Sequence, residues 1–394
     1  MDLAYQKNME YLRERMREDG YLLGVAAGSG ITARYAEAAG CHMLLALNSG
    51  KFRQMGQGSL AGFLCYANSN EMVMEFARKE LLPTVRKIPI IFGLNGTDPT
   101  ISLYDYIRAI KRLGFAGVNN YPTVGMLNGQ FREALEEEGI SYEAEIETIR
   151  FAHYCGLITV AFAFDAHQAA QMAEAGADII CAHFGLTSGG NLGAKRVLSL
   201  EKAKNTAMEI FRAAEEIRPE IIKIVYGGPV KTPVDAQYMY YNSGCQGFIG
   251  GSVFERIPVE KAIFETACAF RNAQNAKPQT QMDRLLFHNG GTGYTDFVKE
   301  YINEHYMEEI KLNELARVAH LTPTYLSALF TKEVGCGFRK YLIQFRMKKA
   351  RRLITEEKVP LARAAQMVGY QDYAQFSKMY KKYNGELPSA GGRK

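Results

Sequence analysis

Glycines and polar side chains follow eight short apolar runs in the first 256 residues, and their types suit ligand binding or proton transfer. Asp98, His183 and Glu255 are candidate catalytic residues, because carboxylates and imidazole exchange protons. Gly227-Gly228 and Gly251-Ser252 follow the last two runs, where backbone N–H groups could bind a phosphate or carboxylate. The other candidate ligand-binding residues are Gly28, Ser29, Asn48, Arg53, Asn95, Asn120 and Thr187.

Each of these residues could instead have a purely structural role. The glycines could serve only tight turns, and His183 could stack inside the site without touching a ligand. The carboxylates in this set are Asp98, Asp165 and Glu255, and their positions in the sequence do not show that they converge. We therefore predict no metal site. The cofactor is left open, with Mg²⁺ relevant only if the site is catalytic.

The elements that must position these residues follow from the hydrophobic pattern. Apolar runs predict strands at Leu22–Ala26, Met43–Leu47, Pro89–Gly93, Gly117–Asn119, Ile158–Phe164, Ile179–Ala182, Ile222–Val225 and Gly247–Ile249. Amphipathic stretches predict helices at Glu71–Val85, Leu103–Leu113, Ser141–Tyr154, Ala166–Ala175, Leu200–Ile217 and Val259–Ala273. Eight strand–helix units in about 250 residues match a (β/α)8 TIM barrel, with a doubly wound open sheet as the alternative.

In a barrel, the loops after the strands share one rim, and that rim carries function. The candidate residues above would therefore face a common site. Asp178 and Cys245 precede strands and should lie at the opposite, structural face, while His153 falls within a helix and is not expected to be catalytic.

A second kind of chemistry, contact with DNA, is indicated by a pattern that occurs twice between residues 311 and 388. Each copy is a short apolar-faced helix, a tight turn and a second helix with its own apolar stripe. This is the layout of a helix-turn-helix, whose second helix enters a DNA major groove. The copies are Leu312-x-x-Leu315-Ala316 with Thr322-x-x-x-Leu326-x-x-Leu329-Phe330, and Leu361-x-x-Ala364-Ala365 with Asp372-x-x-x-Phe376-x-x-Met379-Tyr380.

Thr322 and Asp372 are the expected N-caps of the two recognition helices, and Gly369 suits the turn of the second copy better than His320 suits the first. Residues 338–355 predict one long helix that would hold the two copies for successive major grooves, about 34 Å apart. The candidate DNA-binding residues are Thr324, Ser327, Ala328, Tyr373, Gln375 and Lys378. The first three are too short for bidentate base contacts, so we expect the second helix to carry more of the direct readout.

Charge is distributed unevenly along the chain. Residues 294–394 contain 18 Lys and Arg against 11 Asp and Glu, whereas the remainder contains 29 against 31. The basic excess therefore coincides with the predicted recognition helices, as contact with phosphates requires. No apolar stretch is long enough for a membrane span. The seven scattered cysteines and the absence of a signal-peptide pattern favour a reduced, cytoplasmic location.

The last hundred residues resemble the DNA-binding domain of AraC/XylS-type transcription regulators. The resemblance rests on Leu326, Phe330, Gly335, Phe338, Tyr341, Arg346, Ala350, Leu353, Ala365, Val368, Gly369, Phe376, Tyr380, Lys381, Gly385 and Pro388-Ser389. It implies binding to double-stranded DNA, and a homodimer is expected from the family.

Residues 15–270 resemble the TIM-barrel family called phosphoenolpyruvate hydrolase-like, which is related to the phosphoenolpyruvate mutase and isocitrate lyase superfamily. The matching stretches include Asn48-Ser49-Gly50, Thr97-Asp98-Pro99, Asn120-Tyr121-Pro122-Thr123-Val124-Gly125, His183-x-Gly185-Leu186-Thr187 and Gly227-Gly228-Pro229. One departure concerns the position before Gly-Gly-Pro, where the family usually has histidine and this chain has Tyr226. Because an ordinary tyrosine titrates near pH 10, it would not replace a histidine base.

These observations predict a ligand-binding barrel over residues 1–275, a linker over 276–293, with a short helix at 282–287, and a DNA-binding domain over 294–394. The leading hypothesis is a transcription regulator whose barrel senses a small, anionic metabolite. The alternative is a bifunctional enzyme, a lyase or hydrolase acting on a phosphoenolpyruvate-like or keto-acid substrate. A barrel retained only as a dimerisation scaffold is a third possibility.

Overall fold

The computed structural model describes residues 2–195, 197–272, 294–319, 321–356 and 359–389. The chain divides into two compact units, residues 1–263 and 264–394, each of which is described by itself below. The predicted linker and its short helix, together with His320, lie outside the described residues.

The first unit is a closed barrel of eight parallel strands in sequential order. The strands are β1 (Leu22–Ala27), β2 (Met43–Ala46), β3 (Ile90–Leu94), β4 (Gly117–Asn120), β5 (Ile158–Ala163), β6 (Ile179–His183), β7 (Ile222–Tyr226) and β8 (Gly247–Gly250). The barrel closes through β1 and β8, where Gly24 pairs with Ile249. The TIM barrel is thus confirmed, and the open-sheet alternative is wrong.

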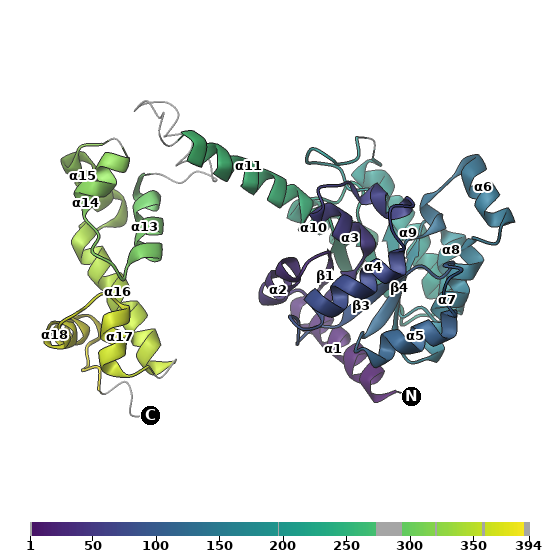
Figure 1. The fold of residues 1–394 in the computed structure, drawn as a ribbon, viewed down its shortest axis with the longest axis horizontal. Helices are drawn as coiled ribbons and strands as arrows, with labels where there is room; N and C mark the ends of the chain where they lie inside the picture. Colours follow the sequence, from purple (N-terminus) through teal and green to yellow (C-terminus); the bar gives the residue numbers. More distant parts are fainter. Residues whose placement is uncertain (1, 196, 273–293, 320, 357–358, 390–394) are drawn as a thin grey trace. The chain divides into compact units, whose positions relative to one another are not determined.

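Helices surround the strands (Figure 1). They are α1 (Leu3–Asp19), α2 (Gly30–Ala38), α3 (Asn48–Gln54), α4 (Ser69–Phe76), α5 (Leu103–Arg112), α6 (Gly129–Glu137), α7 (Tyr142–Tyr154), α8 (Ala166–Glu174), α9 (Leu200–Ile217) and α10 (Pro233–Ser243). The last helix of this part of the chain, α11 (Arg256–Asn272), crosses the boundary between the two units. The helix predicted at 71–85 instead continues from α4 into a π-helical segment, η2 (Ala77–Leu81). There Glu80 accepts hydrogen bonds from the Gly30 N–H and from Lys51.

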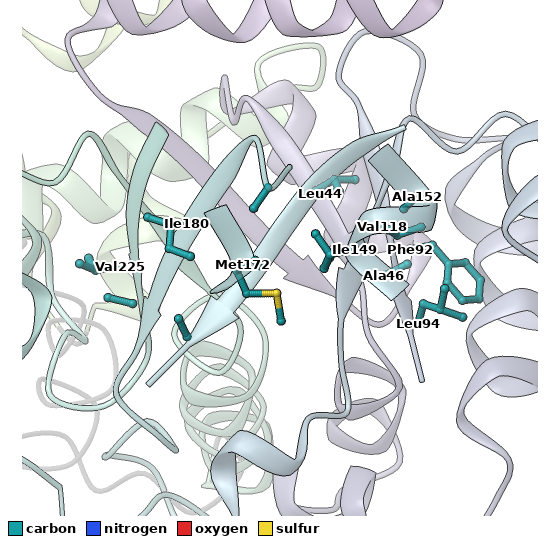
Figure 2. Close-up of a cluster of buried hydrophobic side chains, with 14 of the residues drawn as sticks. Leu44, Ala46, Phe92, Leu94, Val118, Ile149, Ala152, Met172, Ile180 and Val225 are labelled. Atoms are coloured by element: carbon teal, nitrogen blue, oxygen red, sulfur yellow. The ribbon is translucent and has the colours of Figure 1, made fainter. Parts of the chain in front are cut away.

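Alternating side chains of each strand enter two different cores, as the two-residue period of a strand requires. One set, including Leu45, Ile91 and Phe162, fills the barrel interior. The other set packs outward against the helices. Figure 2 shows this layer, in which Leu44, Phe92, Val118, Ile180 and Val225 from the strands lie among Ile149, Ala152 and Met172 from α7 and α8.

The face at the N-terminal ends of the strands is structural, as predicted for Asp178. The buried Asp178 carboxylate accepts hydrogen bonds from the Tyr5 hydroxyl (2.6 Å), from the Thr159 backbone and side chain, and from Arg218 (3.1 Å). The Tyr5 bond joins α1 to the face of the barrel at the N-terminal ends of the strands.

The second unit contains α13 (Tyr294–His305), α14 (Leu312–Val318), α15 (Pro323–Val334), α16 (Phe338–Thr355), α17 (Leu361–Met367) and α18 (Tyr373–Asn384). Two hydrophobic clusters form around α16. Its first half contributes Phe338 and Leu342 to a cluster with α13, α14 and α15, and its second half contributes Met347 and Leu353 to a cluster with α17 and α18. The long connecting helix predicted at 338–355 is therefore the element that both helix-turn-helix motifs share.

Candidate functional site

A buried ion pair lies at the C-terminal rim of the barrel. Arg53, on α3, donates from Nε and Nη2 to Oε2 of Glu255 at 2.8 and 2.7 Å, and neither side chain is more than 1 % exposed. The other Glu255 oxygen accepts the Gly28 N–H at 2.6 Å. Arg53 also donates to the Ala26 carbonyl at 2.7 Å. Burial lowers the pKa of Arg53, but the charge and hydrogen bonding of Glu255, together with Tyr226 and Tyr121, outweigh burial, so the pKa lies above its ordinary value.

The same guanidinium reaches the hydroxyls of Ser49 (3.4 Å) and Ser59 (3.3 Å). Both serines line a cavity of about 20 Å³ at the barrel mouth, whose other polar lining residues are Tyr121, His183, Thr187, Tyr226 and Ser252. This is room for about one water molecule. A neighbouring hollow of about 120 Å³ shares Ser59, Thr187 and Ser252 with it. We refer to the inner space as the mouth cavity.

His183 and Tyr226 stack on each other beside the mouth cavity, with ring centroids 4.7 Å apart and an interplanar angle of 19°. Burial lowers the pKa of His183 to about 3. Because its Nδ1 accepts the Gly185 N–H at 3.0 Å, the neutral ring carries its proton on Nε2. Burial also raises the pKa of Tyr226 above its ordinary value and that of Tyr121 to about 12. All three rings are therefore neutral hydrogen-bond donors near neutral pH.

Two of the predicted glycines are required by close backbone approach. A Cβ on Gly28 would lie 1.9 Å from the Gly50 carbonyl carbon, so the loops after β1 and β2 touch directly. A Cβ on Gly251 would lie 2.9 Å from both Arg53 Nη2 and the Tyr226 hydroxyl. These contacts explain the glycines by packing around the ion pair. Gly227 and Gly228 have φ values of +70° and +59°, and the Gly228 N–H is donated to the Gly185 carbonyl.

The predicted carboxylates do not gather into a metal site. Glu255 is occupied by Arg53 and Gly28, and Asp165 is the exposed N-cap of α8. Asp98 lies in a different pocket and accepts four hydrogen bonds, from the side chains of Asn68 and Asn70 and from the Thr100 N–H and hydroxyl. Within the described part of the chain, no three His, Cys, Asp or Glu side chains are placed to hold a metal ion. The three candidate carboxylates therefore do not converge on one ion.

The remaining predicted residues have mainly structural contacts. Asn120 bonds the Phe162 backbone and Glu145, Asn95 caps its own loop through Thr97, and Ser29 caps α2. Asn48 lies on α3 and donates to the Gly62 carbonyl, while its Oδ1 is buried without a partner. The structure therefore brings Arg53, Glu255 and Gly251 together, with His183, Thr187 and Ser252 nearby. It does not bring Asp98, Asn95 or Asp165 to them.

Sequence reasoning missed Ser49, Ser59, Tyr121 and Glu145. Tyr121 and Ser49 lie inside the quoted family motifs and could have been found there, whereas nothing local marks Ser59 or Glu145. Glu145, on α7, accepts the Val124 N–H and an Asn120 N–H, each at 2.7 Å, and so anchors the loop after β4. Burial raises the pKa of Glu145 to about 7.

In the second unit, the two recognition helices are related by a shift of 50 residues. Thr322 and Asp372 cap α15 and α18 as predicted, and Gly335 and Gly385 end them with left-handed φ values of +76° and +80°. The candidate residues Thr324, Ala328, Tyr373, Gln375 and Lys378 are exposed, and Ser327 is half-buried. Tyr325 stands at the position equivalent to Gln375 and is 54 % exposed. The 50-residue repeat could have identified it.

One basic residue of the family pattern has an internal role. Arg346 is half-buried on α16 and donates to the carbonyls of Tyr306 (2.7 Å) and Glu308 (2.6 Å). Its guanidinium also lies over the Tyr370 ring. It therefore connects the segment after α13 to the second helix-turn-helix. None of the helices that the structure describes combines the length and the apolar character needed to cross a bilayer.

Known protein families match residues in both units. Residues 7–273 match the family model described as phosphoenolpyruvate hydrolase-like, and residues 315–393 match a helix-turn-helix domain. The ToMV susceptible protein tm-1(GCR26) of Solanum lycopersicum is 41% identical over 265 residues, which is 67% of this chain and 35% of that protein. The protein y4pA of Sinorhizobium fredii is 35% identical over 251 residues, covering 64% of this chain and 41% of that protein.

Among solved structures, the C-terminal domain of AraT, a response regulator from Geobacillus stearothermophilus, is 29% identical, with a TM-score of 0.25. It covers 26% of this chain and 85% of that one. The regions that match this chain in the Solanum lycopersicum and Sinorhizobium fredii proteins span between a third and a half of the length of those proteins. The chain belongs to the phosphoenolpyruvate hydrolase-like family, and its barrel is followed by an AraC-type helix-turn-helix DNA-binding domain.

Proposed function

We propose that this protein is a transcription regulator whose barrel binds a small anionic metabolite and whose second unit binds a DNA operator. The observation that carries the ligand proposal is the excess of hydrogen-bond donors around the mouth cavity. Arg53 donates to Ser59, which leaves the Ser59 hydroxyl proton free to point into the cavity, whereas Ser49 also has a hydrogen bond with Tyr121. His183, Tyr121 and Tyr226 are neutral donors there. Such a lining suits the oxygen of a carboxylate or phosphate that lies in the neighbouring hollow of about 120 Å³ and reaches into the mouth cavity.

The same lining argues against the enzymatic alternative. A general base works best with a pKa near the operating pH. The described cavity lining offers a histidine with a pKa of about 3 and two tyrosines with raised pKa values, and the nearby Glu255 is bound to Arg53. These groups can hold and polarise an anion. Glu145, whose pKa burial raises to about 7, does not line the mouth cavity, so the lining itself supplies no base for lyase or hydrolase chemistry.

The DNA proposal is supported by the two repeated helices and by the charge of their unit. The exposed residues of α15 and α18 lie beside buried anchors that are also 50 residues apart, Leu326 with Phe376 and Phe330 with Tyr380. Two equivalent recognition helices that are joined by one connecting helix suit two successive major grooves. A homodimer would place two such pairs on an operator with twofold symmetry, and that assembly remains part of the proposal.

The ligand half is tested by thermal unfolding of the full-length protein with inorganic phosphate, pyruvate, phosphoenolpyruvate or oxalate. A ligand that binds only the folded state must raise the melting temperature. We expect at least one of these anions to do so and Ser59→Ala to reduce the effect, whereas the control Ser102→Ala, which loses a hydroxyl bonded to exposed Asp105, should not. Failure of all four anions to stabilise the protein would contradict an anion sensor.

The DNA half is tested with fragments selected by the full-length protein from a random pool. Lys378→Ala should weaken binding and make the dependence of log K on log salt shallower by about 0.9, the contribution of one phosphate contact. Lys202→Ala on α9 of the barrel serves as the charge-matched control. Unchanged affinity and sequence preference for Lys378→Ala at fixed salt would remove α18 from the interface.

A further inference from the structure

A second pocket, separate from the mouth cavity, lies between the segment 62–69, the loop after β3 and the loop after β4. It has a volume of about 430 Å³ and shares no lining residue with the mouth cavity. Pockets of this size hold small organic ligands. We refer to it as the Asp98 pocket.

The two ends of the Asp98 pocket differ in chemistry. Apolar side chains from the loop after β4 and from α6 form one wall, including Leu127, Phe131 and Leu135. Phe131 is 65 % exposed, so a large aromatic face is available to a ligand. The other end carries polar groups, among them Asp98, Thr97 and Ser69. A ligand that fits both ends has an apolar or aromatic body and one polar head.

The polar end is negatively charged. Burial raises the pKa of Asp98, but the hydrogen bonds from Thr100, Asn68 and Asn70 outweigh burial and hold the pKa below its ordinary value. The carboxylate is therefore ionised at neutral pH. All its hydrogen-bond donors in the structure are neutral groups, and no Lys or Arg is among the described residues that line the pocket. A carboxylate stabilised only by neutral donors leaves a negative potential that attracts a cation.

A second observation marks the same end of the pocket as a place for a ligand. Ser69 is 8 % exposed and lines the pocket, yet its hydroxyl has no hydrogen-bond partner. Buried hydroxyls normally have one, because an unpaired one costs free energy. A protonated amine bound near Asp98 would offer a positive charge to the carboxylate, and rotation of the Ser69 side chain would bring the buried hydroxyl oxygen to an N–H of the amine.

We propose that the Asp98 pocket is a second ligand site, which takes a small organic amine with an apolar or aromatic body. The site does not depend on the mouth cavity or on DNA binding. The two cavities nevertheless have a common wall, because Phe63 of the pocket packs edge-on against Tyr121 of the mouth cavity with ring centroids 5.4 Å apart.

Cys65 provides a local readout, since it lines the pocket and is an exposed free cysteine. Cys268 and Cys336 are half-exposed and do not line it, so they report any general effect on the protein or the reagent. The experiment measures the rate at which iodoacetamide modifies each cysteine of the full-length protein by peptide mass spectrometry. The probes are 2-phenylethylamine, 2-phenylethanol and phenylacetate, which share one body and differ in head charge.

We expect 2-phenylethylamine to slow the modification of Cys65 by about threefold or more, because only its head is attracted by the ionised carboxylate. The alcohol and the acid should leave the rate unchanged, and Cys268 and Cys336 should not respond to any probe. No slowing by the amine would overturn the proposal. Equal slowing by all three probes would overturn it too, since the pocket would then recognise only the apolar body.

The apolar wall is tested with matched phenylalanine variants. Phe131→Ala should raise the amine concentration needed for protection by about five- to tenfold, the range expected for one aromatic contact. Phe151→Ala on α7, a residue that does not line the pocket, should leave it unchanged. Asp98→Asn is not used, because its amide group would meet N–H donors and weaken the fold. Varying the head of the probe tests the charge instead. Equal protection in the two phenylalanine variants would place the ligand elsewhere.

Discussion

Arg53 and Glu255 form a buried ion pair that joins the loops after β1, β2 and β8, although the two residues are 202 positions apart in the chain. The pair carries no net charge, but it directs Arg53 toward the serines of the mouth cavity. Four residues of the rim therefore contact this ion pair: Gly28 through its N–H, Gly251 through its close backbone approach, and Ser49 and Ser59 through their hydroxyls.

Glu255→Ala should lower the free energy of unfolding of the barrel by about 3–5 kcal/mol, because it leaves a buried guanidinium without its partner. Urea denaturation followed by circular dichroism measures this loss. Glu216→Ala, which breaks an exposed pair with Arg212, is the control and should cost less than about 1 kcal/mol. Similar losses for both variants would mean that the Arg53 pair does not hold the rim together.

Gly251→Ala should destabilise the barrel by about 1–3 kcal/mol, since the added methyl group meets Arg53 and Tyr226 at 2.9 Å. Gly58→Ala is a matched control, because its Cβ would meet only the Leu192 carbonyl, at 3.8 Å, and its φ of −74° suits alanine. The two variants are compared by thermal unfolding in the same buffer. A neutral Gly251→Ala would show that the ion pair can move without cost.

His183 should make the barrel less stable in acid. Its pKa is about 3 in the folded protein and 6.5 in the unfolded chain. The unfolded chain therefore binds a proton first as the pH falls. The contribution of the neutral imidazole to the free energy of unfolding is fully present above pH 6.5. It is lost between pH 6.5 and 3, by at most about 1.4 kcal/mol per pH unit.

The measurement is the difference in unfolding free energy between the wild-type protein and His183→Gln at several pH values. This difference should decrease steadily as the pH is lowered from 6.5 toward 3. His167→Gln, at an exposed site on α8, controls for loss of a histidine that is not buried and should give a flat difference. A flat difference for His183→Gln as well would mean that the imidazole is not kept neutral by burial.

Arg346→Ala should destabilise the second unit by about 1.5–3 kcal/mol, because the Tyr306 and Glu308 carbonyls lose a charged donor. The salt dependence of DNA binding should remain as in the wild-type protein, since this guanidinium is used internally. Lys378→Ala should do the reverse, with unchanged stability and a shallower salt dependence. If Arg346→Ala made the salt dependence shallower, Arg346 would be a phosphate contact.

The sequence by itself determined the barrel, the paired helix-turn-helix motifs and their caps. Apolar periodicity and capping chemistry act over a few residues, so runs such as 158–164 and caps such as Thr322 and Asp372 can be read locally. The 50-residue repeat also defines which faces of α15 and α18 are exposed, and it would have added Tyr325 to the candidate residues.

Only the tertiary structure decided which rim residues meet. Asp98 and Glu255 look equivalent in the sequence, yet Glu255 lies against Arg53 while Asp98 is surrounded by Asn68, Asn70 and Thr100 in another pocket. Nothing local in the sequence indicates that Ser59 lines the mouth cavity or that Glu145 anchors the loop after β4. The physical reason is that loop paths and side-chain directions at the strand ends depend on contacts between segments far apart in the chain, and hydrophobic periodicity carries no information about those contacts.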